Sequence, residues 1–524
     1  MLKRIGDTKV GELRAIASGT LTNGKPVVIN SDGTCSVAGT IAQNVGSGNT
    51  FHSGRTFEHV SVYDSYNKRI VIAYQDDSDS KKGTVIVGTV SGNSISFGTA
   101  VQFKSDEEPE YISMVFDSTN NRIVIIYRDD LAGSSTYYGA ARVGTVNPTD
   151  NSISFGTKVV FNSNTTNYPN SCFDSTNGKV AIFFRNHAST SSQRSNSGIV
   201  GTVNPSDNSI SFGTKTDFGS GSVFYNSITS CDAVHDPDNN KIIMVYNDGN
   251  PSNDPGYAVV CTISGTTISY GTPVVFAENG SSQPSSLSVV YNSQDQRIVI
   301  CYYHRTAIYA ANINMIAGTV SGDSITFGSS SQITAGTGTS YGNYAGSSPS
   351  IAYDVAANKI LLTFYLAGTT KAYYQVVTLD PSDNSLSFSS PIGSGNSPFG
   401  VSLNGSNGSY VNRYSNQLVY DPDNKVVIVP YRDIADNDDA KALAFTNSRV
   451  NMTAENFVGI SASGAANGAG SIIDSAGAIA DNLSGLTAGQ SYYVQTDGTL
   501  GLTADSPSVF AGTAVSATKL IVKG

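Results

Sequence analysis

The stretch YDSYNKRIVIAY at residues 63–74 decides the fold, because the same pattern returns six more times along the chain. Each copy places a cluster of Asp, Asn or Gly between two apolar runs, which is the composition of a tight turn between two strands. We call these strands A and B. The further copies are FDSTNNRIVIIY (116–127), FDSTNGKVAIFF (173–184), HDPDNNKIIMVY (235–246), YNSQDQRIVICY (291–302), YDVAANKILLTF (353–364) and YDPDNKVVIVPY (420–431).

A second repeated phrase follows each strand B, as in VGTVSGNSISFGTAVQF at residues 87–103. It divides at Ser-Gly-Asn into strands C and D, and in strand D Ile95 and Phe97 alternate with serines, which indicates one exposed face. Strand B is apolar throughout and is expected to be buried on both faces. Four strands every 53 to 67 residues suit one blade of a propeller. The sequence therefore predicts an all-β protein, a seven-bladed β-propeller plus a small C-terminal β domain.

The predicted boundaries are an N-terminal segment at 1–24, a propeller at 25–450 and a small β domain at 451–524. Residues 441–446 supply a strand C to the last blade without a clear strand D after it, so N-terminal sequence from residue 25 onward is expected to close the ring. However, LTNGKPVVINSDGT at 21–34 parallels LTAGQSYYVQTDGT at 486–499. Residues 18–40 would then complete the small domain instead, and the sequence leaves both alternatives open.

Composition excludes several classes of protein. A net charge of −10 and a pI near 5.0 leave no basic surface for nucleic acid. No run of 18 apolar residues is present, so no membrane insertion is expected, and residues 1–7 lack the apolar core of a signal peptide. We expect synthesis in a cytoplasm. Five scattered cysteines predict free buried thiols rather than disulfides or a metal site: Cys35, Cys172, Cys231, Cys261 and Cys301.

The repeated VGTVSGxSISFGT blocks and the C-terminal SGLTAGQSYYVQTDGTL at 484–500 resemble virion structural proteins of tailed bacteriophages, especially marine phages of the cyanophage kind. The resemblance covers nearly the whole chain, and its C-terminal phrase is the more specific part. It implies a place in the virion as a tail fibre, a receptor-binding appendage or a head decoration, with other virion proteins as partners and a homo-oligomer as the expected assembly. It implies no catalytic residues.

No catalytic residues and no cofactor are predicted from the residues either. A sialidase-type hydrolase needs a Ser-x-Asp-x-Gly-x-Thr-Trp box, and the chain contains no Trp. A virion-borne or secreted glycan hydrolase remains the alternative, because two suitably placed carboxylates would suffice. No metal site is predicted, since plain turns explain the Asp-Pro-Asp-Asn segments better than Ca²⁺ does; the weak candidate ligands are Asp236, Asp238, Asp421 and Asp423.

Tyrosines in or beside predicted loops are the candidate binding residues. Exposed tyrosine offers a flat apolar ring with a polar tip, which suits stacking on sugar rings or on proteins. The sequence therefore predicts an adhesion or display platform for a host-surface glycan or a virion partner. The candidate residues are Tyr137, Tyr138, Tyr302, Tyr303, Tyr341 and Tyr344.

Overall fold

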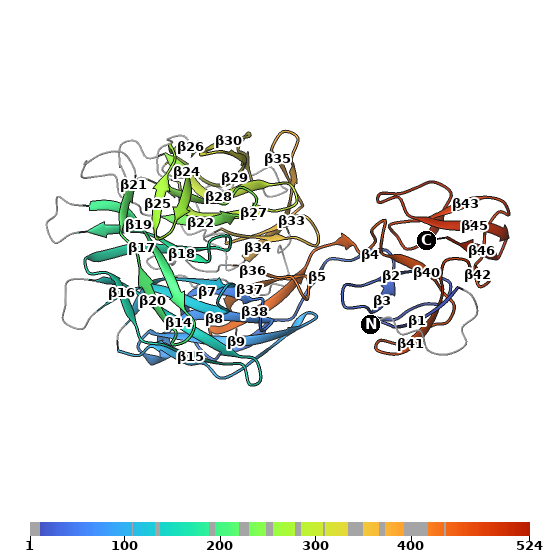
Figure 1. The fold of residues 1–524 in the computed structure, drawn as a ribbon, viewed down its shortest axis with the longest axis horizontal. Helices are drawn as coiled ribbons and strands as arrows, with labels where there is room; N and C mark the ends of the chain where they lie inside the picture. Colours follow the sequence, from blue (N-terminus) through green and yellow to red (C-terminus); the bar gives the residue numbers. More distant parts are fainter. Residues whose placement is uncertain are drawn as a thin grey trace. The chain divides into compact units, whose positions relative to one another are not determined.

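The computed structural model describes residues 11–523 except for residues 107, 131–136, 188–193, 219–229, 248–254, 278–283, 308–309, 334–348, 366–371, 392–417 and 434–435. The described chain is all-β apart from one short 3-10 helix, η1 (Asp77–Asp79). It divides into two compact units, the larger at Val45–Thr446 and the smaller formed by the chain before and after it (Figure 1). No described helix is long and apolar enough to cross a membrane.

The larger unit is the predicted β-propeller. In its described residues, seven antiparallel sheets each contain strands A to D in that order, and we call each sheet a blade. Strands A are β7 (Thr56–Asp64), β12 (Pro109–Asp117), β17 (Thr165–Asp174), β22 (Cys231–Asp236), β27 (Ser285–Asn292), β32 (Ser350–Asp354) and β36 (Val419–Asp421). Strands B are β8 (Arg69–Asp76), β13 (Arg122–Asp129), β18 (Lys179–His187), β23 (Lys241–Asn247), β28 (Arg297–Ala307), β33 (Lys359–Tyr365) and β37 (Val426–Asp433).

The outer strands follow the second repeated phrase. Strands C are β9 (Lys82–Ser91), β14 (Tyr138–Asn147), β19 (Arg194–Asn204), β24 (Gly256–Ser264), β29 (Ala310–Ser321), β34 (Ala372–Asp380) and β38 (Asp439–Thr446). Strands D are β10 (Ser94–Phe97), β15 (Ser152–Phe155), β20 (Ser209–Phe212), β25 (Thr267–Tyr270), β30 (Ser324–Phe327), β35 (Ser385–Phe388) and β5 (Asn44–Val45). A short fifth strand pairs with the rest of strand C in β11 (Val101–Lys104), β16 (Val159–Asn162), β21 (Thr216–Phe218), β26 (Val274–Ala277), β31 (Ser331–Gln332) and β6 (Asn49–His52).

Seven apolar clusters hold the ring together, and each contains side chains from two neighbouring blades. The cluster that joins the last blade to the first contains Ile70 and Ile72 of β8 beside Val426 and Ile428 of β37, all at most 1% exposed. The five cysteines are free and buried, as predicted. The hydrophobic core therefore runs around the ring between blades rather than inside any one of them.

N-terminal strands close the last blade, but they lie after residue 40; residues 18–40 belong to the smaller unit, which was the other alternative. Strand β38 pairs with β5 and β6, at residues 44–52, so the propeller unit begins at Val45 rather than at residue 25. The earlier strands β2 (Pro26–Ile29) and β3 (Cys35–Val37) belong to the smaller unit, where β2 pairs with β40 (Phe457–Ser461). The parallel between residues 21–34 and 486–499 thus reflects membership of one unit.

The smaller unit contains two five-stranded sheets of the same topology. The first has the order β1 (Glu12–Ile16), β41 (Gly470–Asp474), β40, β2, β3. The second has the order β42 (Ile479–Ala480), β46 (Lys519–Val522), β45 (Phe510–Ser516), β43 (Ser491–Val494), β44 (Leu500–Gly501). Two further strands, β4 (Thr40–Ile41) and β39 (Arg449–Val450), pair with each other.

The two sheets correspond residue by residue. Val27 opposes Gly459 in the first sheet as Tyr492 opposes Gly512 in the second, and a bulge follows in both. Both glycines have a left-handed φ, of 146° and 152°, and a Cβ on either would lie 2.1 Å from a carbonyl oxygen of the next strand. The smaller unit is therefore an internal duplication. In the first copy, the propeller is inserted between the third and fourth strands in chain order. In the second copy, the third strand ends at Gly501 and the fourth begins at Phe510 without such an insertion.

Short contacts between blades explain several constant residues of the repeat. A Cβ on the glycine after strand D would lie within 3 Å of the C–D turn of the next blade, so only glycine fits there. The six glycines of this kind are Gly46, Gly98, Gly156, Gly213, Gly271 and Gly328. The seventh position holds Ser389, facing the last blade, whose strand C leaves for the smaller unit instead of making a C–D turn.

Hydrogen bonds also join successive inner strands. A side chain of one strand A accepts a hydrogen bond from a backbone N–H in, or directly before, the next strand A, at an equivalent position in several blades. The bonds run from Ser171 N to Ser113 Oγ (3.0 Å), Val289 N to Asp232 Oδ2 (2.9 Å), Ile351 N to Ser288 Oγ (3.3 Å) and Leu418 N to Ser350 Oγ (3.3 Å). They fix the inner ends of the blades relative to one another.

Candidate functional site at the loop end of the propeller

The propeller has two unlike ends. One end, which we call the turn end, carries the short A–B and C–D turns. The other, which we call the loop end, carries the B–C connections and the connections that lead into strand A. The B–C connections differ in length from blade to blade, from two residues between β28 and β29 to eight between β13 and β14. Binding residues on rigid scaffolds concentrate in such connections.

Strand B ends at the loop end with an aromatic residue followed by a variable one. The aromatic residue is at most 3% exposed in every blade: Tyr74, Tyr127, Phe184, Tyr246, Tyr302, Phe364 and Tyr431. The next residue, in the blades whose side chain is described there, is Gln75, Arg128, Arg185, Asn247, Tyr303 or Arg432. The fold therefore fixes the aromatic position and leaves the following one to vary.

Within the described residues, strand A begins at the same end with a bulge in four blades. The register shifts in β7, β12, β17 and β27, and one residue in each bulge has a left-handed φ: Glu58 (52°), Tyr111 (55°), Tyr168 (54°) and Ser286 (51°). A bulge re-aims its side chain away from the ladder. These side chains also differ between blades, so the bulge is a second variable position at the loop end.

The two variable positions meet in blades 2 and 3. The rings of Tyr111 and Tyr168 have centroids 4.8 Å apart. The guanidinium carbon of Arg128 lies 5.0 Å from the Tyr111 ring and 4.4 Å from the ring of Tyr137. That of Arg185 lies 4.9 Å from the Tyr168 ring. We call these five residues the aromatic cluster; its three tyrosine side chains are half-buried.

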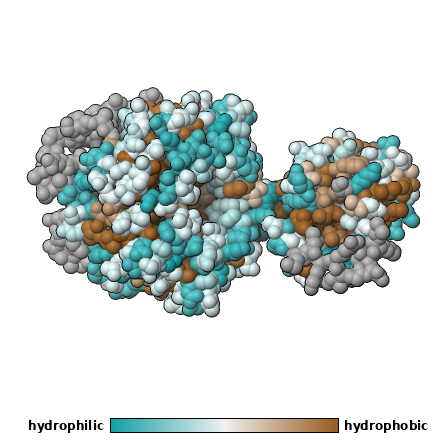
Figure 2. Space-filling model, in the orientation of Figure 1, coloured by the Kyte–Doolittle hydropathy of each residue, from teal (hydrophilic) through white to brown (hydrophobic). Residues whose placement is uncertain are grey.

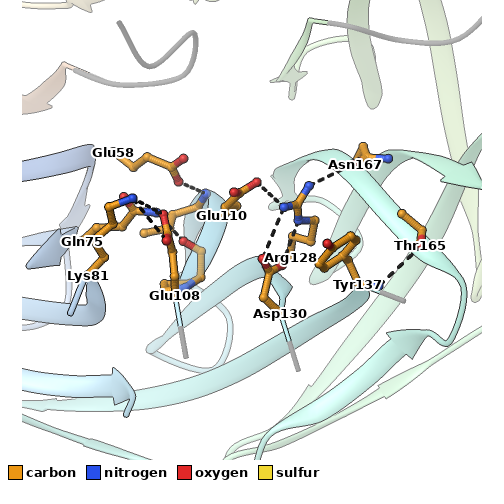
Figure 3. Close-up of polar contacts among 12 residues, drawn as sticks. Glu58, Gln75, Lys81, Glu108, Glu110, Arg128, Asp130, Tyr137, Thr165 and Asn167 are labelled. Carbon is orange, nitrogen blue, oxygen red and sulfur yellow. Dashed lines mark hydrogen bonds and ion pairs between the residues drawn. The ribbon is translucent and has the colours of Figure 1, made fainter. Parts of the chain in front are cut away.

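Charged and amide groups lie around Arg128, which is drawn beside Tyr137 in Figure 3. Arg128 forms ion pairs with Glu110 and with Asp130, the latter at 2.9 Å, and donates to Asn167 Oδ1 at 3.1 Å. Farther along the same end, Lys81 and Glu108 are paired at 3.0 Å. Lys81 and Arg128 therefore have carboxylates beside them, and the three cations Lys81, Arg128 and Arg185 are balanced in number by Glu108, Glu110 and Asp130.

Two inner-strand carboxyl groups have pKa values near neutrality. Burial raises the pKa of Glu58, which is 4% exposed, to about 7, although backbone N–H groups of Ile112 and Tyr111 oppose the shift. Burial likewise raises the pKa of Asp232 to about 6. Values near neutrality suit proton transfer, but each carboxylate accepts a backbone N–H of the next blade, from Ile112 (3.0 Å) and Val289 (2.9 Å). Their observed role is to join blades.

The predicted tyrosines divide into three groups. Tyr137 belongs to the aromatic cluster, and Tyr303 occupies the variable position after the buried aromatic residue of its blade. Tyr302 is that buried residue, with its hydroxyl 2.9 Å from Ser330 Oγ, so its side chain belongs to the core and its prediction as a binding residue is wrong. Tyr138 is half-buried at the start of β14. Tyr341 and Tyr344 lie outside the described residues.

The weak calcium candidates serve the turns. Asp236 accepts from Asn239 N (3.1 Å) and Asp421 from Asn424 N (3.1 Å), as expected of turn-capping aspartates. Asp238 accepts the Tyr291 hydroxyl of the next blade at 2.5 Å, and Asp423 accepts from Tyr63 and from Lys68. Within the described ranges, no group of three or more His, Cys, Asp or Glu side chains is arranged to hold a metal ion.

Comparison with known proteins bears on the fold alone. No family model and no curated protein matches the chain. Similar solved structures include the periplasmic gluconolactonase PpgL of Pseudomonas aeruginosa, at 12% identity and a TM-score of 0.43 over 76% of this chain and 99% of that one. The Dos1 propeller matches at 11% identity and a TM-score of 0.41 over 77% and 95%. The sialidase NanB of Streptococcus pneumoniae matches at 13% identity and a TM-score of 0.40 over 77% and 70%.

Proposed function

We propose that the chain is a non-enzymatic structural and adhesive component of a bacteriophage virion, with the propeller as the display platform and the smaller unit as its mount. The loop end binds a host-surface glycan or a neighbouring virion protein. The observation that carries this proposal is the difference between the propeller's ends: the constant residues of the repeat pack blades together, while the variable ones gather at the loop end.

The duplication in the smaller unit supports its role as a mount. A 402-residue propeller unit occupies a connection that spans a few residues in the second copy. The inserted unit is then free to vary without disturbing the sheets that carry it. Such an arrangement suits a display module on a structural base.

The surface of the smaller unit supports a contact with other subunits. Four of the eight large apolar side chains that are exposed in the described residues belong to it: Ile16, Ile479, Leu502 and Val515. Figure 2 shows apolar surface over this unit. At equivalent positions, Glu12 and Asp474 of the first sheet correspond to Ile479 and Ile521 of the second. Exposed apolar surface of this kind is typical of an interaction site.

Two measurements test the proposal. Electron microscopy of purified particles with gold-labelled antibodies against the chain is expected to place it on the virion, and its position distinguishes a tail appendage from a head decoration. Recombinant protein is expected to bind polysaccharide or cells without releasing reducing sugar. The absence of label from purified particles would contradict the proposed role in the virion. Release of reducing sugar would replace adhesion by the alternative function, glycan hydrolysis.

A further inference from the structure

We infer that the aromatic cluster of Tyr111, Tyr137, Tyr168, Arg128 and Arg185 is a binding site for an uncharged sugar chain. This inference rests on the proposed adhesive function and names the ligand class and the residues. Three observations carry it: the strained placement of two tyrosines, the stacking that fixes the rings, and the balance of charge around them.

Tyr111 and Tyr168 occupy a backbone conformation that disfavours them. A bulky residue with a left-handed φ is strained, whereas Gly and Asn tolerate it. The equivalent bulge positions hold Glu58 and Ser286, so the bulge itself does not require an aromatic ring. Two consecutive blades therefore place tyrosine where the fold would accept smaller residues, and both rings meet at 4.8 Å. Strain that the local fold does not need is a mark of a functional position.

Stacking on arginine holds the rings in place. Arg128 lies over Tyr111 and Tyr137, and Arg185 lies over Tyr168. Arg128 is itself held by Glu110, Asp130 and Asn167 from three directions. Rings that are already oriented lose little freedom when a ligand stacks on them, which favours binding. Each tyrosine side chain keeps part of its surface exposed.

The charge balance selects the ligand. Lys81 is paired with Glu108, and Arg128 with both Glu110 and Asp130, while Arg185 stacks on Tyr168. The two acidic partners of Arg128 offset the charge of Arg185, so the site offers no excess of positive charge to an anionic polymer. Carboxylate and amide groups beside aromatic rings can instead bond sugar hydroxyls, because a carboxylate accepts several hydrogen bonds and an amide both donates and accepts. Neutral hexose polymers fit this combination better than anionic ones.

Affinity gel electrophoresis of the full chain tests the inference. The probes are four neutral polymers, namely an α-glucan, a β-glucan, a galactan and a mannan, together with the anionic polygalacturonate. Wild-type protein is expected to be retarded by at least one neutral polymer and not by polygalacturonate. Tyr111→Asn and Tyr168→Asn should each weaken that binding about tenfold, the loss typical of a central aromatic residue.

The matched control is Ser286→Asn, which makes the same product residue at the equivalent bulge of blade 5. It is expected to bind as the wild type does. Asn suits the left-handed backbone, so all three variants should fold, and near-ultraviolet circular dichroism checks this. Retardation by polygalacturonate alone, or by no polymer, overturns the inference, and so does unchanged binding by both tyrosine variants. Binding to whole cells that survives in the tyrosine variants would retain the adhesive function while removing this site.

Discussion

The turn end and the loop end of the propeller are built from the same strands but use their residues differently. At the turn end, Gly156 and Arg122 each contact the next blade, and the aspartates cap turns. At the loop end, the residues at the bulges and after the buried aromatic residue change from blade to blade. The difference teaches that stability resides in positions that repeat and recognition in positions that do not, so substitutions at the two ends should have opposite consequences.

The largest expected effect is at the turn end, at the glycines that follow strand D. In Gly156→Ser the new Cβ would lie 2.1 Å from the Asn208 carbonyl oxygen of the next blade. We expect a loss of about 3 kcal/mol in the free energy of unfolding, as for overpacking of a close contact. Urea denaturation measures it.

The control is the opposite change, from serine to glycine, at the contact between the sixth and seventh blades. Ser389 stands where the other blades have glycine, and its hydroxyl accepts from Val376 N at 3.0 Å. Ser389→Gly should therefore cost only about 1 kcal/mol, the value of one hydrogen bond. Equal losses in the two variants would show that the next blade's turn is not what selects glycine.

The second effect concerns pH and a carboxyl group at the loop end. Burial raises the pKa of Glu58 from 4.5 to about 7, so the folded protein holds the proton more tightly than the unfolded chain does. Stability from this group is complete below about pH 4.5 and declines as the pH rises to 7, by up to about 3 kcal/mol. Glu58→Gln should remove this slope and be more stable than the wild type at pH 8.

A carboxyl group at the turn end provides the contrast. Although burial opposes it, hydrogen bonds from His235 and Asn177 lower the pKa of Asp174 to about 2. Its contribution is present above the unfolded pKa and is lost as the pH falls toward 2. Thermal unfolding of both variants, Asp174→Asn and Glu58→Gln, is measured between pH 3 and 8. The first should lose the dependence of stability on pH at the acidic end of this range, and the second should lose it at the neutral end. Parallel profiles would contradict the assignment of either group.

Much of the propeller could be predicted from the sequence because its contacts repeat. The seven strand pairs, the burial of strand B and the turn role of Asp236 and Asp421 all follow from local patterns. The sequence does not identify β5 and β6 as the strands that complete the last blade, because they contain few apolar residues. A signal was present: Gly46 precedes Phe51 by the same five residues that separate Gly98 from Phe103. Packing against the neighbouring blade, rather than strand composition, defines that pair.

The candidate site was less predictable. The sequence identifies Tyr137 from its place beside a loop, but Tyr111 and Tyr168 lie within strands β12 and β17. Their rings meet only because a bulge in each strand turns them toward one another. Register shifts depend on pairing with the next strand and leave no mark in a single sequence. The variable residue after the buried aromatic one is the signal that would have identified Arg128 and Arg185.

A third, smaller effect concerns the residue that begins strand B, which contacts the C–D turn of the next blade when that turn is long. Arg122 donates to Asn208 Oδ1 at 2.7 Å and to the Pro205 carbonyl oxygen at 2.5 Å in the Asn-Pro turn of the following blade. Lys179, at the equivalent position, precedes a blade with a short Ser-Gly turn and donates to Thr202 at 2.9 Å in its own blade. Arg122→Lys should cost about 1 kcal/mol, measured by urea denaturation. Lys179→Arg should leave stability within about 0.5 kcal/mol of the wild type.

The smallest effect on stability is expected where the effect on binding is largest. Tyr111→Asn gives up contacts with Tyr168 and Arg128, which are worth about 0.5–1.5 kcal/mol each. It also relieves the left-handed strain of an aromatic residue, about 1–2 kcal/mol. These terms oppose each other, so the free energy of unfolding, measured by urea denaturation, should stay within about 1 kcal/mol of the wild type. A loss of several kcal/mol would place Tyr111 with the packing residues of the turn end, because a position kept for recognition should cost the fold little when it changes.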